Sequence, residues 1–213
     1  MAASDKINTQ HSTVEEWTEA LAESTGSPGG GAGTGVMLAV AASLTSMVAG
    51  YSENADEGLL DRARSLRRTA LRLADEDAVA SKAFGAAFRR DPGPEREEAI
   101  RQASVEAAKA SALLGDYAIA AIEDLGWLAK HGNPALISDV VVAFGALRAA
   151  IAGTRTNVSF DLAALAKDGT TLEQVREKHP KLWDAVSRVD AALGRIDELT
   201  AQVDTKAAPT DTL

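Results

Sequence analysis

Residues 63–88, ARSLRRTALRLADEDAVASKAFGAAF, carry small and apolar side chains at alternating intervals of three and four residues. This spacing predicts a helix that packs one face against neighbouring helices. The face comprises Ala63, Leu66, Ala70, Leu73, Asp77, Ala80, Phe84 and Ala87. Asp77 is therefore a carboxylate at a position where a core residue is expected.

Asp77 has two interpretations at this position. A buried carboxylate is costly unless it is hydrogen-bonded, paired or protonated, and such carboxylates are often groups that transfer protons. The same residue can instead form a structural ion pair with an Arg or Lys from a neighbouring helix, because ion pairs also perturb carboxylates. The spacing alone leaves both interpretations open.

Helical patterns cover most of the 213 residues, of which 46% are hydrophobic and 4% aromatic. Much of the apolar content is Ala, which favours closely packed helices. We expect an all-α fold, a bundle of about five to seven long antiparallel helices. One domain would span 12–204, between flexible tails at 1–11 and 205–213. The expected helices lie near 13–24, 34–52, 55–90, 94–130 with a bend at Gly115, 134–152, and 171–203 with a break at Pro180.

Charge and cysteine content exclude several kinds of partner and chemistry. A net charge of −9 argues against a nucleic acid or an anionic membrane surface as partner. The chain has no cysteine, and therefore no disulfide and no thiolate. The N-terminus has no basic region followed by an apolar run, which predicts a cytoplasmic protein without a signal peptide. The three histidines show no helical ligand spacing, so we expect no transition-metal site.

The stretch between Glu23 and Glu53 contains no charged residue. It is rich in Gly, Ala, Ser and Thr and has no closely flanking Lys or Arg, which predicts a buried central helix rather than a membrane span. Residues 27–33 within it read SPGGGAG. Consecutive glycines let the backbone approach a ligand and present N–H groups at a helix N-terminus. The alternative is a flexible linker.

Two later segments combine polar and apolar side chains. Residues 132–139 read GNPALISD, and Asp139 falls in the second turn of a nearly uncharged helix. We expect Asp139 to be buried and favoured by the helix dipole, with capping as its alternative role. Residues 157–162 read NVSFDL, within an expected irregular or extended connection at 153–162. Loops often carry functional residues, and a surface connector is the alternative.

These three segments, in this order and with Asp77 between the first and second, resemble the cyclodeaminase/cyclohydrolase family. Its members include the C-terminal domain of formiminotransferase-cyclodeaminase and some bacterial methenyltetrahydrofolate cyclohydrolases. The resemblance covers residues 13–200. Pro28-Gly29-Gly30-Gly31 matches the family's Pro-Gly-Gly-Gly loop, and Asp75-Glu76-Asp77-Ala78 matches its Asp-x-Asp-Ala segment, whose second Asp is catalytic. The set Gly132, Asn133, Ser138 and Asp139 matches its Gly-Asn-x4-Ser-Asp segment. Residues 157–162 match its Asn-Val-x-x-Asn-Leu segment in part.

The resemblance implies an all-helical homodimer that binds a tetrahydrofolate derivative at or near the subunit interface, without a prosthetic group. It implies one of two reactions: the folate N10 attacks a formimino carbon on N5 and ammonia leaves, or water opens a methenyl bridge. Either reaction needs one proton taken and one given, which a carboxylate with a raised pKa can do. Asp77 would be this general acid/base. The implied substrate-binding residues are Pro28, Gly29, Gly30, Gly31, Asn133, Ser138, Asp139, Asn157 and Arg89.

The chain departs from the family pattern at positions that could contact a ligand. A basic stretch after the second helix is replaced by the acidic residues 52–58, SENADEG. Ser81 replaces a Phe, Asp161 replaces the second Asn of the late segment, and Arg89-Arg90-Asp91-Pro92 replaces a Leu-Pro-Lys. Arg89 or Arg90 would bind the glutamate tail of a folate in place of the missing basic stretch.

Two alternatives to folate chemistry stay open at this stage. The same scaffold can act on a different amidine or imine, or it can be an inactive helical module for binding or assembly. The sequence also does not choose between ammonia loss and water addition.

Overall fold

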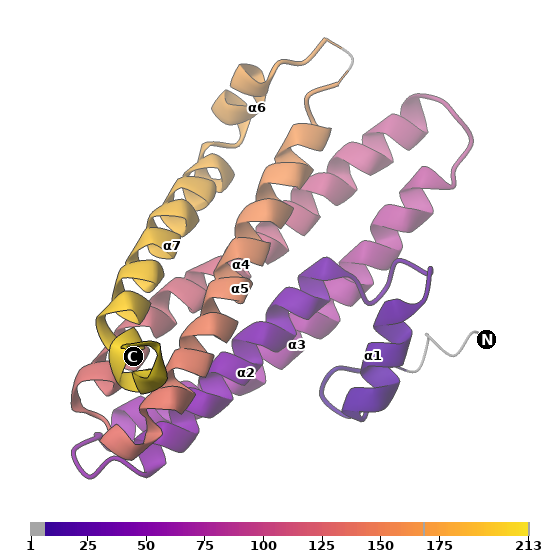
Figure 1. Cartoon of the computed structure of the whole chain (residues 1–213). Helices are drawn as coiled ribbons and strands as arrows, with labels where there is room; N and C mark the ends of the chain where they lie inside the picture. Colours follow the sequence, from indigo (N-terminus) through magenta and orange to yellow (C-terminus); the bar gives the residue numbers. More distant parts are fainter. Residues whose placement is uncertain (1–6, 168, 213) are drawn as a thin grey trace.

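Helices build the whole of the fold, and no strand occurs among residues 7–167 and 169–212, which the computed structural model describes. The five long helices lie side by side, and successive ones run antiparallel (Figure 1). This arrangement confirms the predicted all-α bundle. The elements are α1 (Val14–Ala22), α2 (Gly30–Gly50), α3 (Glu57–Phe88), α4 (Pro94–His131), η2 (Pro134–Leu136), α5 (Ile137–Ala164), α6 (Leu172–Lys178), α7 (Pro180–Ala207) and η3 (Pro209–Thr212).

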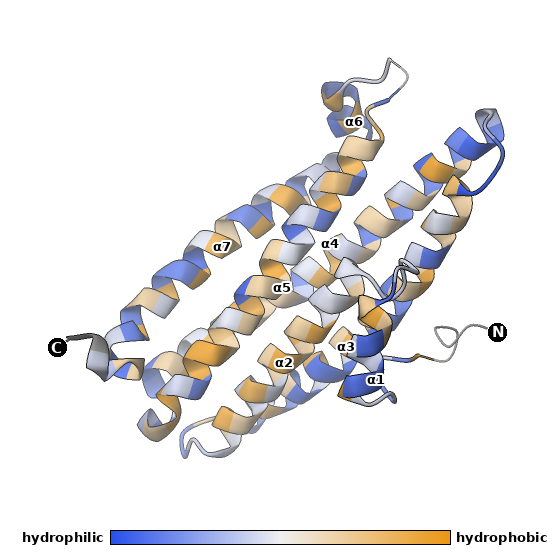
Figure 2. Cartoon of the chain, turned by 45° about the vertical axis from the view of Figure 1, so that its right-hand side comes forward, coloured by the Kyte–Doolittle hydropathy of each residue, from blue (hydrophilic) through white to orange (hydrophobic). Residues whose placement is uncertain are grey.

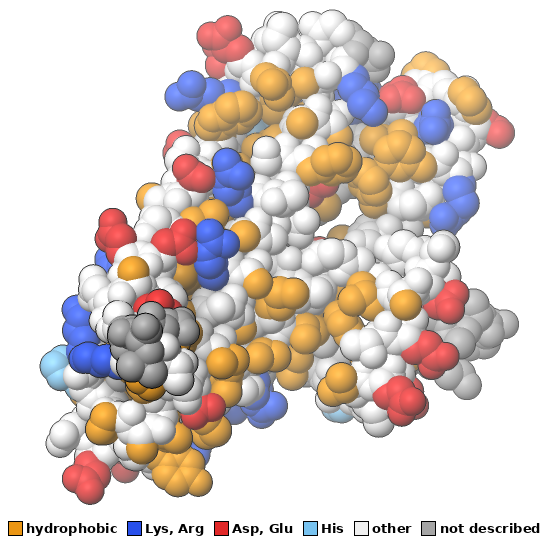
Figure 3. All heavy atoms as spheres, viewed as in Figure 1, with side chains coloured by type: hydrophobic (Ala, Val, Ile, Leu, Met, Phe, Trp, Pro, Cys, Tyr) orange, Lys and Arg blue, Asp and Glu red, His pale blue; other side chains and the backbone are white. Residues whose placement is uncertain are grey.

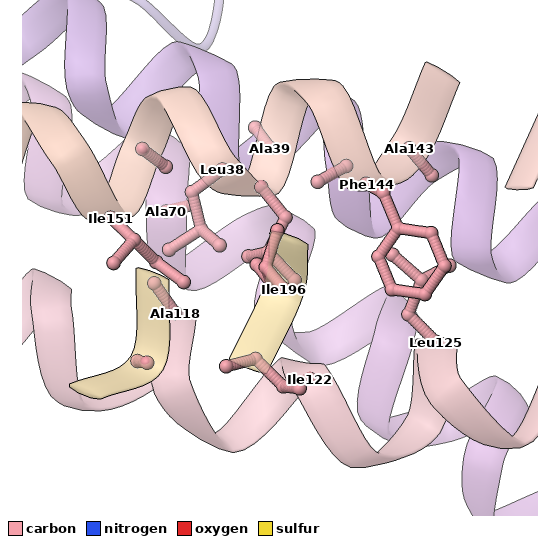
Figure 4. Close-up of a cluster of buried hydrophobic side chains, with 14 of the residues drawn as sticks. Leu38, Ala39, Ala70, Ala118, Ile122, Leu125, Ala143, Phe144, Ile151 and Ile196 are labelled. Carbon is pink, nitrogen blue, oxygen red and sulfur yellow. The ribbon is translucent and has the colours of Figure 1, made fainter. Parts of the chain in front are cut away.

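The core lies between the long helices. α2 packs against α3 and α5, while α4 packs against α3, α5 and α7. Their inward-facing side chains form one buried cluster, part of which is seen in Figure 4. Phe144, Ile122, Ile151 and Ile196 lie among its fully buried members and come from α5, α4 and α7. Burying such apolar surface is the main force that holds the helices together.

Small residues let three helix pairs approach closely. A Cβ at Gly35 of α2 would lie 2.8 Å from the Cβ of Ala74 on α3. A Cβ at Gly153 of α5 would likewise press against Thr34 of α2, and a Cβ at Gly115 of α4 would press against Thr154 of α5. Glycine at these sites serves helix packing, since any larger side chain would force the backbones apart.

The close approach at Gly153 explains one wrong prediction. Residues 153–162 were expected to form an irregular or extended connection, but α5 continues without interruption to Ala164. Gly153 is a packing position inside a helix and not a helix stop. α2 begins at Gly30, before the expected start at residue 34. α4 is one helix through Gly115, as expected for 94–130, and the bend at Gly115 stays a prediction. The predicted break at Pro180 is confirmed, because α6 ends at Lys178 and α7 begins at Pro180.

The segments expected to be tails are partly described. Residues 1–6 and 213 lie outside the described residues. The backbone N–H of Thr9 donates a hydrogen bond to Oδ1 of Asp75 on α3, and Nε1 of Trp17 donates one to the Thr9 hydroxyl. At the other end, α7 extends to Ala207.

Two helical stretches, Gly30–Gly50 and Pro134–Ala164, are long and apolar enough to cross a membrane by length and composition. The core helix of a soluble bundle meets the same criteria, and 56% of the α2 window is buried inside the bundle. Figure 2 shows the contrast between these two helices and α3 and α7, whose outer faces are rich in hydrophilic residues.

Candidate functional site

The Asp77 carboxylate is buried where α3 crosses the N-terminus of α2, with 9% of its surface exposed. The backbone N–H of Ala32 donates a hydrogen bond to it. The Ser81 hydroxyl, one turn along α3, donates a long hydrogen bond of 3.4 Å to Oδ2. The expected burial of Asp77 on the packed face is therefore confirmed. No Arg or Lys among the described residues forms an ion pair with Asp77. The alternative interpretation, a structural ion pair, therefore finds no partner in the described part of the chain.

Burial and two hydrogen bonds act on the pKa of Asp77 in opposite directions. Loss of water around the carboxylate raises the pKa of Asp77 above its ordinary value, because the charged form is poorly solvated. The Ala32 N–H and the Ser81 hydroxyl stabilise the ionised form and offset part of this rise. A raised pKa of this kind moves a carboxyl toward the range in which general acid/base catalysis works.

A cavity of about 360 Å³ opens over Asp77. The surface of the molecule is hollowed in this region, where the loop before α2 passes below the upper ends of α3, α4 and α5 (Figure 3). None of the residues that line the cavity is a Lys, Arg or His. Its lining consists of Gly26, Gly29, Gly30, Gly31, Asp77, Ser81, Phe84, Gly85, Ala107, Ser111, Thr156, Asn157, Phe160 and Asp161.

The glycine segment forms the floor of this cavity and is not a linker. The Ser27 hydroxyl donates a hydrogen bond of 2.8 Å to the carbonyl of Ala78, which ties the segment to α3 beside Asp77. Pro28 is buried, and Gly29, Gly30 and Gly31 all line the cavity. A methyl group at Gly31 would overlap both carboxylate oxygens of Asp77. The start of α2 therefore lies directly against the carboxylate, and its Ala32 N–H bonds to Asp77.

Asp161 is a second carboxyl in the cavity, and the sequence did not single it out as a site residue. It lies on α5, one turn beyond Asn157, and is half-buried. Burial, together with the negative charge of Asp77, raises the pKa of Asp161 from 3.8 to about 7. The signal in the sequence was the interval of four between Asn157 and Asp161, which places both on one helix face. The expected irregular connection concealed it.

Asn133, Ser138 and Asp139 lie at a distance from Asp77 in the fold. The backbone N–H of Asn133 donates to the Ser52 hydroxyl, and its side-chain Nδ2 donates to the carbonyl of Tyr51, beyond the C-terminus of α2. Asp77 sits at the opposite end of this 21-residue helix, which spans about 30 Å.

None of these three residues lines the cavity around Asp77. Asn133 does cap the following turn, since its Oδ1 accepts a hydrogen bond from the N–H of Ala135. Asp139 is half-buried rather than fully buried. Their role in substrate binding stays a prediction.

Arg89 reaches the rim of the cavity. It is exposed at the C-terminus of α3, and a Cβ at the cavity residue Gly85 would lie 3.4 Å from its guanidinium nitrogen. This position suits a contact with an anionic group that extends out of the cavity. No group of three or more His, Asp or Glu side chains that could hold a metal ion occurs within the described ranges.

The chain was compared with known proteins by sequence and by fold. The sequence model of the family described as "Formiminotransferase-cyclodeaminase" matches residues 13–181. The crystal structure of formiminotetrahydrofolate cyclodeaminase from Thermotoga maritima has the same fold, with a TM-score of 0.74 and 21% sequence identity, over 92% of this chain and 99% of that chain. A search of curated proteins found no match. Because the family match spans most of the bundle, the chain belongs to the formiminotransferase-cyclodeaminase family.

Proposed function

We propose that this chain is a one-carbon folate enzyme that binds a tetrahydrofolate derivative over Asp77 and uses this carboxyl as its general acid/base. The observation that carries the proposal is the Asp77 carboxyl itself, buried under a cavity and held by the N–H of Ala32. Family membership supplies the class of substrate, and it supports a reaction at a carbon–nitrogen bond of the folate. The substrate brings the one-carbon unit, so the proposal needs no prosthetic group.

In the cyclodeaminase reaction, N10 of the folate attacks the formimino carbon on N5. A new bond forms between this carbon and N10, the N10 proton is removed, and ammonia leaves once its nitrogen is protonated. Asp77, which lines the cavity, would take or give these protons. The cyclohydrolase reaction, in which water opens a methenyl bridge, makes similar demands on one carboxyl and is the alternative within the same family.

A different amidine or imine substrate is the second candidate. It is favoured by the composition of the cavity, which has two carboxyls and no cationic side chain in its lining. Such a site suits a positively charged nitrogen compound, whereas the carboxylates of a folate tail would need Arg89 or Arg90 outside it. A helical module without catalytic activity is the third candidate. A folded Asp77→Leu variant of higher stability would favour it, provided that neither the wild type nor Asp77→Asn shows turnover.

We also propose that the chain is a cytoplasmic protein and forms a homodimer. The exposed apolar face of α2 and α5 supports the dimer. Met37, Val40 and Met47 on α2 are 45%, 45% and 38% exposed, and Val142 on α5 is 59% exposed. Figure 3 shows hydrophobic side chains gathered over the middle of this face. Contiguous exposed apolar surface of this kind marks an interaction site.

A twofold axis across this face would also bring the two ends of α2 together. If the α2 helices of two subunits packed antiparallel, the Asn133–Asp139 segment of one subunit would approach the cavity of the other. This geometry would explain how residues near opposite ends of α2 serve one site. The predicted contacts of Asn133, Ser138 and Asp139 with substrate depend on it.

Folate binding and turnover test the proposal. Purified protein is titrated calorimetrically with 5-formyl- and 5,10-methenyl-tetrahydrofolate. Absorbance then follows formation of the methenyl chromophore from 5-formimino-tetrahydrofolate, or its loss from 5,10-methenyl-tetrahydrofolate. Micromolar binding with turnover that Asp77→Asn abolishes is the expected result. No binding up to millimolar ligand would overturn the folate assignment, and binding with normal turnover in Asp77→Asn would overturn the role of Asp77.

A further inference from the structure

Two carboxyls from different helices share one cavity without a cation in its lining. Asp77 comes from α3 and Asp161 from α5, and the backbone of Gly29–Gly31 at the start of α2 lies beside them. Neither carboxyl forms an ion pair within the described part of the chain. The family segment that residues 157–162 resemble carries Asn where this chain has Asp161, so the second carboxyl is a property of this chain.

We propose that Asp161 is a second proton-transfer residue, and that Asp77 and Asp161 work as a pair in which one carboxyl is ionised and the other neutral. The inference rests on the proposed function for the reaction that the pair serves. Like charges in one poorly solvated site do not ionise together easily, and the first proton to leave makes the second harder to remove. Burial opposes ionisation of Asp77, but the Ala32 N–H and the Ser81 hydroxyl stabilise its ionised form. We therefore assign the negative charge of the pair to Asp77.

The groups that face Asp161 support this assignment. α3 contributes Asp77 and Ser81, α4 contributes Ala107 and Ser111, and the α2 segment contributes glycine backbone. On α5 itself the cavity neighbours are Thr156, Asn157 and Phe160, all of them uncharged. Arg89 lies outside the lining, against Gly85. The pKa of Asp161 accordingly responds to burial and to the charge of Asp77, and both raise it.

A singly protonated pair would balance the cyclodeaminase reaction without an outside proton. Starting from the protonated formimino group, N10 attacks the carbon, the carbon–N10 bond forms, and ionised Asp77 takes the N10 proton. Neutral Asp161 then gives its proton to the formimino nitrogen, the bond between this nitrogen and carbon breaks, and ammonia leaves a methenyl cation. The pair carries one proton before and after, which has moved from Asp161 to Asp77. The net negative charge of the pair favours the cationic forms of substrate and product throughout.

The first test needs no substrate. Aspartate labelled with ¹³C at the side-chain carboxyl is incorporated, and its NMR signals are titrated with pH in wild type, Asp161→Asn and Asp77→Asn. We expect one carboxyl of the wild type to titrate near pH 7. This signal should be absent in Asp161→Asn and should move to lower pH in Asp77→Asn, because the charge of Asp77 is then gone. An Asp161 signal that does not respond to Asp77→Asn would overturn the pair.

The second test is the pH profile of kcat. Asp77 must be ionised and Asp161 protonated, so kcat should fall at low pH and again above about pH 7. In Asp161→Asn, kcat should drop at least tenfold, and the decrease above pH 7 should disappear. Asp184→Asn, an exposed change on α7, is the matched control and should leave both unchanged.

The two tests separate the inference from the proposed function. A coupled pair by NMR, together with a wild-type kcat profile in Asp161→Asn, would overturn the role of Asp161 in proton transfer. A coupled pair in a protein that turns over no folate would refute the proposed function, while the NMR result would still establish the carboxyl pair. Circular dichroism of each variant confirms that it is folded.

Discussion

Gly31 leaves the space that the Asp77 carboxylate occupies, since a methyl group at residue 31 would overlap both of its oxygens. The glycine at the N-terminus of α2 and the carboxylate on α3 therefore depend on each other. The run of glycines has a physical reason at this position: it lets the helix N-terminus come close enough for the Ala32 N–H to reach Asp77.

The first prediction concerns Gly31→Ala. The added methyl should push the Asp77 carboxylate out of its place, and displacement by about 1 Å can lower kcat roughly a hundredfold. Gly33→Ala is the matched control, because nothing lies within 4 Å of a Cβ there, and it should retain wild-type activity. Steady-state kinetics of both variants check this. Wild-type kcat in Gly31→Ala would mean that the position of Asp77 does not matter for turnover.

The second prediction concerns Asp77→Asn, which keeps the shape of the side chain and removes its proton chemistry. Turnover should fall by roughly 10² to 10⁴, the range expected for a general acid/base, while folate binding should change little. Calorimetry measures the binding and stopped-flow absorbance the chemical step. If binding were lost and the residual rate per bound folate were normal, Asp77 would be a binding residue only.

The third prediction is a pH dependence of stability from Asp161. Its pKa is raised in the folded state, from 3.8 to about 7, so folding favours the protonated form. The corresponding stability is fully present below pH 3.8 and is lost as pH rises through 7. Asp161→Asn removes the penalty of the ionised carboxyl, and it should be more stable than wild type at pH 8 by roughly 2 to 4 kcal/mol. Urea unfolding at pH 4 and pH 8 measures this, and an equal difference at both pH values would contradict it.

The sequence predicted the packed face of residues 63–88, the all-helical bundle and the burial of Asp77, because side-chain spacing reports directly on helix faces. It misplaced the end of α5, since a glycine that stops a helix and one that packs against Thr34 look the same in a sequence. Asp161 was missed as a site residue for a second reason. Its proximity to Asp77 depends on how α3 and α5 pack, and spacing along one helix contains no information on distances between helices.

The fourth prediction tests the proposed dimer. Val40→Glu places a charge in the middle of the apolar face of α2, where its burial against a second subunit would be costly. The variant should be monomeric by sedimentation equilibrium at concentrations where the wild type is dimeric. Val14→Glu, at an exposed position on α1, should leave the dimer intact. A wild type that is itself monomeric would remove the dimer from the proposal.

The fifth prediction asks whether the two ends of α2 meet across that dimer. If Asp139 of one subunit completes the cavity around Asp77 of the other, Asp77→Asn and Asp139→Asn should each be inactive as pure proteins. Mixing them through partial unfolding and refolding produces dimers in which one site has both wild-type residues. Random pairing in equal amounts should restore about a quarter of wild-type activity. Restoration should fail when both proteins also carry Val40→Glu. A mixture without activity, formed from proteins that exchange subunits, would mean that Asp139 acts within its own chain or not at all.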